Sequence, residues 1–144
     1  MATVELRFSP LPEHVRTARL VAAAVARRAG VDEAVLDEVR LAVGEACSRA
    51  VGLHIGHGLD TPVRVALTED EKVFRIEVGD DVPQVAHSPA HGSSAEGDGA
   101  EGDDESDLGL AVISGLVDDL EVSADGHGGL IRMSWPTSSA SVES

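Results

Sequence analysis

The chain has little of three things that would each define a class of protein: cysteine, basic side chains and long apolar runs. Its single cysteine, Cys47, excludes a disulfide framework and a thiolate metal cluster, and favours a reducing compartment. Acidic residues outnumber basic ones by 26 to 11, which gives a net charge of -15. Because phosphate binding requires a basic surface, we expect no contact with nucleic acid.

Segments that would target or anchor the chain in a membrane are also missing from the sequence. The longest apolar run, from Leu20 to Ala26, is far shorter than the roughly 18 to 20 residues of a membrane span. No charged and then apolar leader opens the chain. We therefore expect a cytoplasmic protein without a membrane partner. The length of 144 residues favours one domain, because domains most often have about 100 to 150 residues.

The order of periodic segments predicts the fold class. Alternation of apolar and polar residues predicts strands, and apolar residues at spacings of three and four predict helices. Helices grouped against such strands are typical of an α+β fold, a two-layer sandwich with the helices on one face of a mixed, mostly antiparallel sheet. The expected strands are residues 3–8, 62–68, 73–78, 120–123 and 130–135. The expected helices are residues 11–29, a second helix that starts at Asp32 and Glu33 and ends near Gly52 to Gly56, and residues 107–120.

Two segments lie outside this pattern. Residues 84–106 are rich in glycine and acidic side chains and have almost no apolar anchor, so they bury too little area to offset the entropy of ordering. We expect a mobile acidic lid there, since a long loop inside a compact domain tends to be a lid or an insertion. Residues 137–144 are a polar, serine-rich tail, which we expect to be disordered. The single domain is therefore expected to span residues 1–136.

The second expected helix carries the most informative side chains. Glu45 and Arg49 lie at the edge of an apolar stripe that includes Val39, Val43 and Ala46. An acid at such an edge can point along a cleft. The alternative is an ordinary pair of opposite charges four residues apart, which contributes roughly 0.2 to 0.5 kcal/mol to a helix without any function.

Three motifs occur in a fixed order: an acid on a helix, in Glu45-Ala46 through Arg49; an aspartate after a strand, in Asp80 through Gln84; and a glycine turn that opens a helix, in Asp107-Leu108-Gly109-Leu110. This set resembles the ATP-binding fold of histidine kinases and gyrase-type ATPases, and most closely the anti-sigma factor serine kinases of bacterial partner-switching systems. The resemblance covers roughly residues 3 to 136.

The resemblance implies a role for each motif residue. Glu45 matches the glutamate that activates the substrate serine, and Asp80 matches the aspartate that accepts from the adenine amino group. Gly109 and Leu110 match the phosphate turn. The position of the metal-binding asparagine is occupied by Arg49.

Departures from the family pattern oppose nucleotide binding. Arg49 puts a cation where Mg²⁺ would be held, while Val82 and Gln84 replace glycines that allow close approach to the ring. Asp107 puts a carboxylate where a helix N-terminus would receive a phosphate. The expected lid has no Lys or Arg, and one like-charge contact near 4 Å costs up to about 4 kcal/mol before screening. We expect weak or absent nucleotide binding.

The resemblance leaves three hypotheses. The leading one is an anti-sigma factor, expected to be a homodimer, that sequesters a sigma factor and is released by an anti-anti-sigma protein; no cofactor is expected. The second is an active kinase that uses ATP and Mg²⁺ to phosphorylate a serine of that partner. The third is a nucleotide-independent scaffold with no sigma partner.

A basic stripe on the first expected helix is the predicted partner surface. In so acidic a chain, arginine beside apolar side chains is typical of an interface, whereas an ordinary solvated face carries both signs. Only Glu13 lies near the stripe in sequence. We expect it to dock an acidic partner surface; its residues are Arg16, Arg19, Leu20, Ala23 and Arg27.

Two further patterns are rejected. His54 and His57 are spaced to share a metal, but a site needs three or four ligands and no partner is evident, so we expect histidines at a helix end, favoured by the dipole. Gly126, Gly128 and Gly129 have no helix after them. We expect them to be turn residues, and we predict no metal site.

Overall fold

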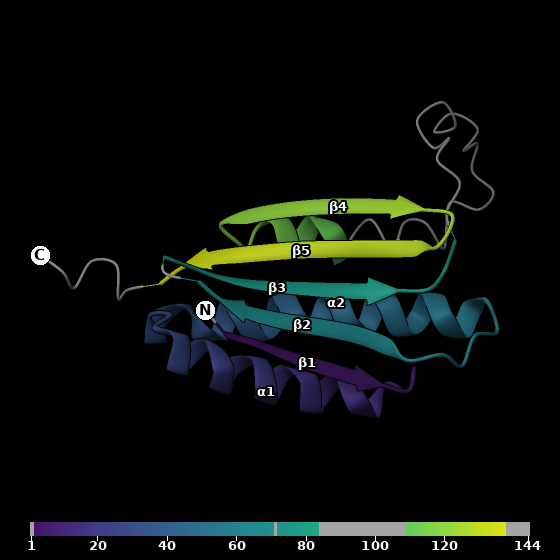
Figure 1. Cartoon of the computed structure of the whole chain (residues 1–144), viewed down its shortest axis with the longest axis horizontal. Coiled ribbons are helices and arrows are strands. Elements are labelled where there is room, and N and C mark those ends of the chain that lie inside the picture. The colour runs from purple at the N-terminus through teal and green to yellow at the C-terminus, as the bar shows by residue number, and fades with distance from the viewer. Residues whose placement is uncertain (1, 71, 84–108, 138–144) are drawn as a thin grey trace, which may run out of the picture.

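The computed structural model describes residues 2–70, 72–83 and 109–137 (Figure 1). The predicted lid, Asp107 and all of the predicted tail except Thr137 lie outside the described residues. No helix in the described ranges is long and apolar enough to cross a membrane. Residues 109–114 are helical, and the labelled elements are β1 (Ala2–Phe8), α1 (Glu13–Ala29), the 3-10 turn η1 (Glu33–Val35), α2 (Leu36–Gly56), β2 (Val63–Glu69), β3 (Val73–Asp80), β4 (Asp119–Asp125) and β5 (Gly128–Pro136).

The five strands form one sheet in the order β1-β2-β3-β5-β4. Figure 1 shows α1, α2 and the helical residues 109–114 on the same side of this sheet, which leaves its other face uncovered by described helices. The predicted α+β sandwich is therefore confirmed. All four strand pairings are antiparallel, so the described sheet contains no parallel pair, although the sequence prediction allowed for one.

Alternation along the central strands places every second side chain in the core, as predicted. Phe74 of β3 and Trp135 of β5 lie opposite one another in the register, with ring centroids 6.3 Å apart. The apolar stripe of α2, which includes Val39, Val43 and Ala46, faces this layer of buried side chains. The buried strand residues are Val63, Val65 and Leu67, then Phe74, Ile76 and Val78, then Ile131, Met133 and Trp135.

The turn between α1 and α2 brings the two helices back alongside each other. Gly30 ends α1 with a φ of 98°, a left-handed conformation that glycine adopts without a steric penalty. Its N–H donates to the carbonyl of Arg27, and the N–H of Val31 donates to that of Ala26. Asp32 then accepts from the N–H of Ala34 and caps the start of η1.

The third helix ends earlier than predicted. The sequence prediction extended it to Leu120, but the helical residues end at 114, and Leu120 pairs with Met133 inside the sheet. Gly115 breaks the helix, since glycine is unfavourable in a helix interior. Leu116 and Val117 lie in the connection to β4 and pack against the core. They keep the apolar spacing of the helix although they are not helical.

Candidate functional site

Glu45 and Arg49 lie one turn apart on α2, and both are half-buried. Gly109 approaches Glu45 closely: a side-chain carbon built on this glycine would lie 3.5 Å from Glu45 Oε1. The structure thus brings together two of the residues that the family pattern predicted, from segments far apart in sequence. Leu110 follows and packs, half-buried, against the core.

Asp80 ends β3 and is almost fully buried, with 3% of its surface exposed. Its Oδ1 accepts hydrogen bonds from the backbone N–H of Val82 at 2.9 Å and of Gly129 at 3.2 Å. Val82, which stands where the family has a glycine, is itself 2% exposed. This carboxylate is therefore hydrogen-bonded to the chain's own backbone, next to a buried apolar side chain.

Gly128 allows the β4–β5 turn to pack against Asp80. Its φ is 152°, and a side-chain carbon there would lie 2.1 Å from the backbone oxygen of Asp80, which no real contact permits. Asp125 holds the same turn, because its Oδ1 accepts from the N–H of His127 and of Gly128. The His127 hydrogen bond is the largest cause of a lowered pKa for the Asp125 carboxyl.

His54 joins the end of α2 to this strand end. The ring is fully buried, Nδ1 lies 3.0 Å from the carbonyl oxygen of Thr61, and Nε2 lies 2.9 Å from the backbone nitrogen of Asp81. A carbonyl only accepts and an N–H only donates, so Nδ1 carries the proton and Nε2 accepts. The expectation that His54 is a helix-end histidine favoured by the dipole was incomplete, because it did not include the buried ring and its two hydrogen bonds. Its spacing of four from Ala50 places it in the buried stripe, and that signal was available in the sequence.

Asp81 turns outward and forms an ion pair with Arg64 at 2.8 Å. Partial burial raises the pKa of Asp81, but the hydrogen bond from the Thr61 side chain and the charge and hydrogen bond of Arg64 outweigh it, so the pKa is lowered overall. The Arg64 guanidinium also lies over Gly79, where an added side-chain carbon would meet Nη2 at 3.0 Å. The residues after β3 are thus held from both sides of the sheet.

Neither a metal centre nor a reactive thiol is found among the described residues. No group of three His, Cys, Asp or Glu side chains there is arranged to hold a metal ion. Burial of the Cys47 thiol raises its pKa to about 12, so it stays protonated and is a poor nucleophile.

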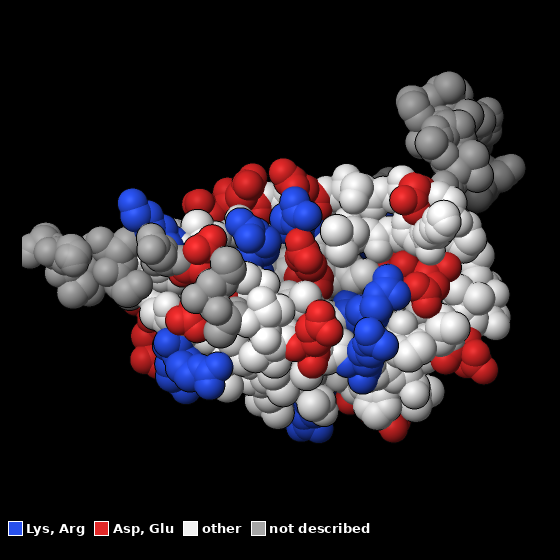
Figure 2. Space-filling model, viewed as in Figure 1, with Lys and Arg blue, Asp and Glu red and all other residues white. Residues whose placement is uncertain are grey.

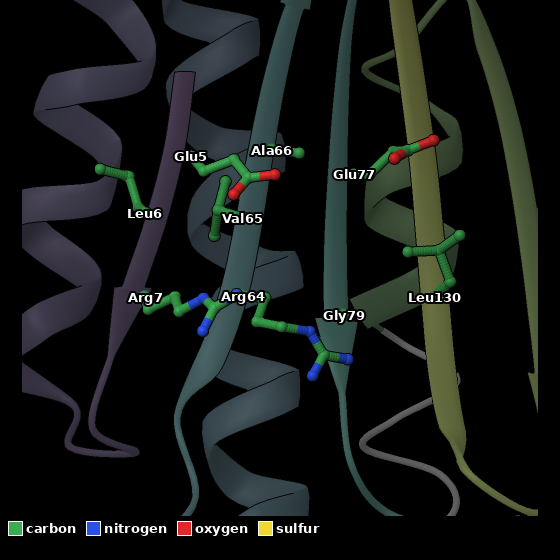
Figure 3. A pocket seen from close by; sticks show the side chains of 9 residues that line it. All are labelled: Glu5, Leu6, Arg7, Arg64, Val65, Ala66, Glu77, Gly79 and Leu130. Carbon is green, nitrogen blue, oxygen red and sulfur yellow. The ribbon is translucent and has the colours of Figure 1, made fainter. Parts of the chain in front are cut away.

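A shallow pocket lies on the open face of the sheet (Figure 3) and has a volume of about 160 Å³. Its charged lining residues are Glu5, Arg7, Arg64 and Glu77. These charges balance, and Arg64 is already paired with Asp81. Figure 2 shows the same mixture of signs across this face, which is typical of a solvated surface.

A second concave region is a groove of about 440 Å³ between α1 and α2, on the helix layer. Two leucines line it, Leu20 with 62% and Leu41 with 51% of their surface exposed. We call it the α1/α2 groove, and its lining residues are Arg16, Arg19, Leu20, Asp37, Arg40 and Leu41.

The structure changes the predicted partner surface in two respects. Arg16, Arg19 and Leu20 are exposed as expected, but Ala23 is 6% exposed and so is not part of an exposed face. The reason is that α1 packs against α2 as well as the sheet, which widens its buried stripe. Arg27 is exposed but forms an ion pair with Glu33 at 3.0 Å. Glu33 therefore lies near the stripe in space, although the expectation drawn from nearness in sequence named only Glu13.

Comparison with known proteins gives the class of this fold. The model of the histidine kinase-like ATPase domain matches residues 8–135, so the chain belongs to that family. The resemblance stated from the sequence is confirmed at this level.

Among the solved structures that share the fold is that of the RsbU and RsbW domains of Rv1364c from Mycobacterium tuberculosis, with a TM-score of 0.68 and 15% sequence identity. The match covers 95% of this chain but only 33% of the other, so the chain spans about a third of that protein's length. A search of curated proteins finds no significant relative.

Proposed function

We propose that this chain is a cytoplasmic anti-sigma factor of the partner-switching type, which binds and inhibits a sigma factor and is countered by an anti-anti-sigma protein. The family membership, the order of the three motifs and the fold shared with the RsbU and RsbW domains of Rv1364c support this role. In this proposal the chain acts by protein binding, as a homodimer, without nucleic acid. Its nucleotide binding and kinase activity are weakened or lost.

The observation that carries the loss of nucleotide binding is the packing around Asp80. In the family this carboxylate accepts from adenine, but here it is almost fully buried, its Oδ1 accepts two backbone N–H groups, and buried Val82 stands at the position that the resemblance matches to a glycine. Arg49 stands where the metal-binding asparagine belongs. These residues do not fit ATP and Mg²⁺ well, and we therefore assign them no catalytic step.

An active serine kinase is the second candidate, and one observation favours it. Glu45 lies against Gly109, as a catalytic glutamate beside the phosphate turn would. Calorimetric titration with ATP and Mg²⁺ separates the two functions. We expect affinity no better than about 1 mM, which corresponds to roughly 4 kcal/mol of binding free energy.

Two variants complete this titration. Arg49→Asn combined with Asp107→Gly should raise the affinity if these residues block the site. Micromolar binding by the wild type, with phosphate transfer to a partner that Glu45→Ala abolishes, would establish the kinase instead.

A further inference from the structure

The α1/α2 groove combines exposed apolar area with positive charge that has no ionic partner among the described residues. Leu20 and Leu41 come from different helices and line the same groove. Each is more than half exposed, and exposed leucines gathered in one concave region mark binding surfaces more often than isolated ones do. Neither residue is required by the core, which lies on the opposite side of both helices.

The charge of the groove is opposite to that of the protein. Three arginines and one aspartate line it, in a chain of net charge -15. Arg40 is paired with Asp37, whereas Arg16 and Arg19 form no ion pair with any described residue. Two guanidinium groups are thus left to bind a carboxylate from outside.

A glycine in α2 shapes this surface. Gly44 is buried, and a side-chain carbon on it would lie 2.7 Å from Cδ of Arg19. The aliphatic part of Arg19 therefore crosses from α1 over α2 at this glycine. Such packing covers apolar area with the stem and leaves the guanidinium at the edge of the groove.

We propose that the α1/α2 groove binds an amphipathic helix of a partner protein, whose apolar anchors are flanked by Asp or Glu. A helix lying between two helices buries its apolar face against Leu20 and Leu41, and its acids reach Arg16 and Arg19. A second copy of this chain docked groove to groove would bring like-charged arginines together. A nucleic acid would leave the two leucines exposed to solvent. The identity of the partner as a sigma factor or its antagonist rests on the proposed function; the groove does not.

Two synthetic helical peptides test this proposal. Both carry leucines at spacings of three and four, and beside them one has glutamates and the other lysines. Because the net charge of the protein is -15, electrostatic attraction to the surface as a whole favours the lysine peptide. We expect tighter binding of the glutamate peptide, because screening over about 8 Å at physiological salt lets the local arginines dominate.

Paired variants locate the binding. Leu20→Ser with Leu41→Ser, and separately Arg16→Glu with Arg19→Glu, should each lower the affinity for the glutamate peptide at least about tenfold. The matched controls are Ile55→Ser, another exposed apolar residue of α2, and Arg28→Glu, another exposed arginine of α1; both should bind like the wild type. Amide shifts of the isotope-labelled wild type on adding the peptide should be confined to α1 and α2, a readout that needs no mutation.

The outcomes separate this proposal from the proposed function. Three results would overturn the proposal that the groove binds an acidic amphipathic helix: tighter binding of the lysine peptide, no binding of either peptide, or unchanged binding of the glutamate peptide by the serine variant. If a sigma factor is captured by the wild type while the glutamate peptide binds the serine variant as tightly as the wild type, the groove proposal fails and the anti-sigma role stands. If no sigma factor is captured while the glutamate peptide still binds at the groove, the role fails and the groove stands.

Discussion

Polar groups have opposite surroundings at the end of β3 and in the α1/α2 groove. At the strand end, Asp80 and His54 are buried and hydrogen-bonded to the chain itself. In the groove, Arg16 and Arg19 have no described ionic partner, and leucines face solvent. A polar group satisfied internally gains little from a ligand, whereas an open one gains more. We infer that the strand end now serves stability and that the groove serves binding.

The largest effect on stability is expected from Gly128→Ala. The new methyl group would overlap the backbone oxygen of Asp80, and the positive φ adds strain, for a cost of at least about 2 kcal/mol. Gly126→Ala is the matched control in the same turn, because nothing lies within 4 Å of its added carbon. Urea unfolding measures both; equal stabilities would show that the turn does not press against Asp80.

His54→Leu should have the next largest effect. It keeps the volume but leaves the N–H of Asp81 without its acceptor, at a cost of about 1 to 3 kcal/mol. His57→Leu, at an exposed position three residues away, should change stability by less than about 1 kcal/mol. Thermal unfolding distinguishes them. A His54→Leu protein as stable as the wild type would mean that the buried ring does not hold the strand end.

A smaller effect is expected from the Asp81–Arg64 pair. The folded pKa of Asp81 is lowered from its ordinary value of 3.8, so its contribution is present above that value and is lost as the pH falls through the lower folded pKa. Solvent screens the pair, so we expect under about 1 kcal/mol. Asp81→Asn should therefore be less stable than the wild type at neutral pH and equally stable in strong acid. A difference that persists in acid would indicate another cause.

The smallest effect on stability is expected in the groove. Leu20→Ser with Leu41→Ser removes exposed apolar groups, and the free energy of unfolding should change by about 0.5 kcal/mol or less per site. Urea unfolding measures this directly. A loss of several kcal/mol would show that the leucines belong to the core, and the contrast between the two regions would then disappear.

Sequence alone predicted what depends on local periodicity. The inward residues of β2 and β3 and the buried stripe of α2 follow from alternation and from helical spacing, and all of them are buried or half-buried in the fold. The approach of Gly109 to Glu45 was expected only through the family resemblance, because no local pattern fixes a contact between residues so far apart.

Two of the failures, at Ala23 and at the groove, share one physical cause, which is contact with a second neighbour. Ala23 is buried because α1 touches α2 as well as the sheet, and a single-face pattern does not report this. Leu120 joined β4 although its spacing was helical, since the core accepts apolar residues from either conformation. The groove itself escaped prediction, because Leu41 and Arg40 become neighbours of Leu20 only when the two helices pack.

The most direct test of the account is capture of partners from the protein's own cells by the tagged full chain, in buffer without added nucleotide and with Mg²⁺ removed by a chelator. The account predicts that a sigma factor is retained by the wild type, by Arg28→Glu and by Glu45→Ala, and is lost from Arg16→Glu with Arg19→Glu. Retention of a sigma factor only when Mg-ATP is supplied would contradict it, because binding would then depend on the nucleotide site that the account holds to be closed.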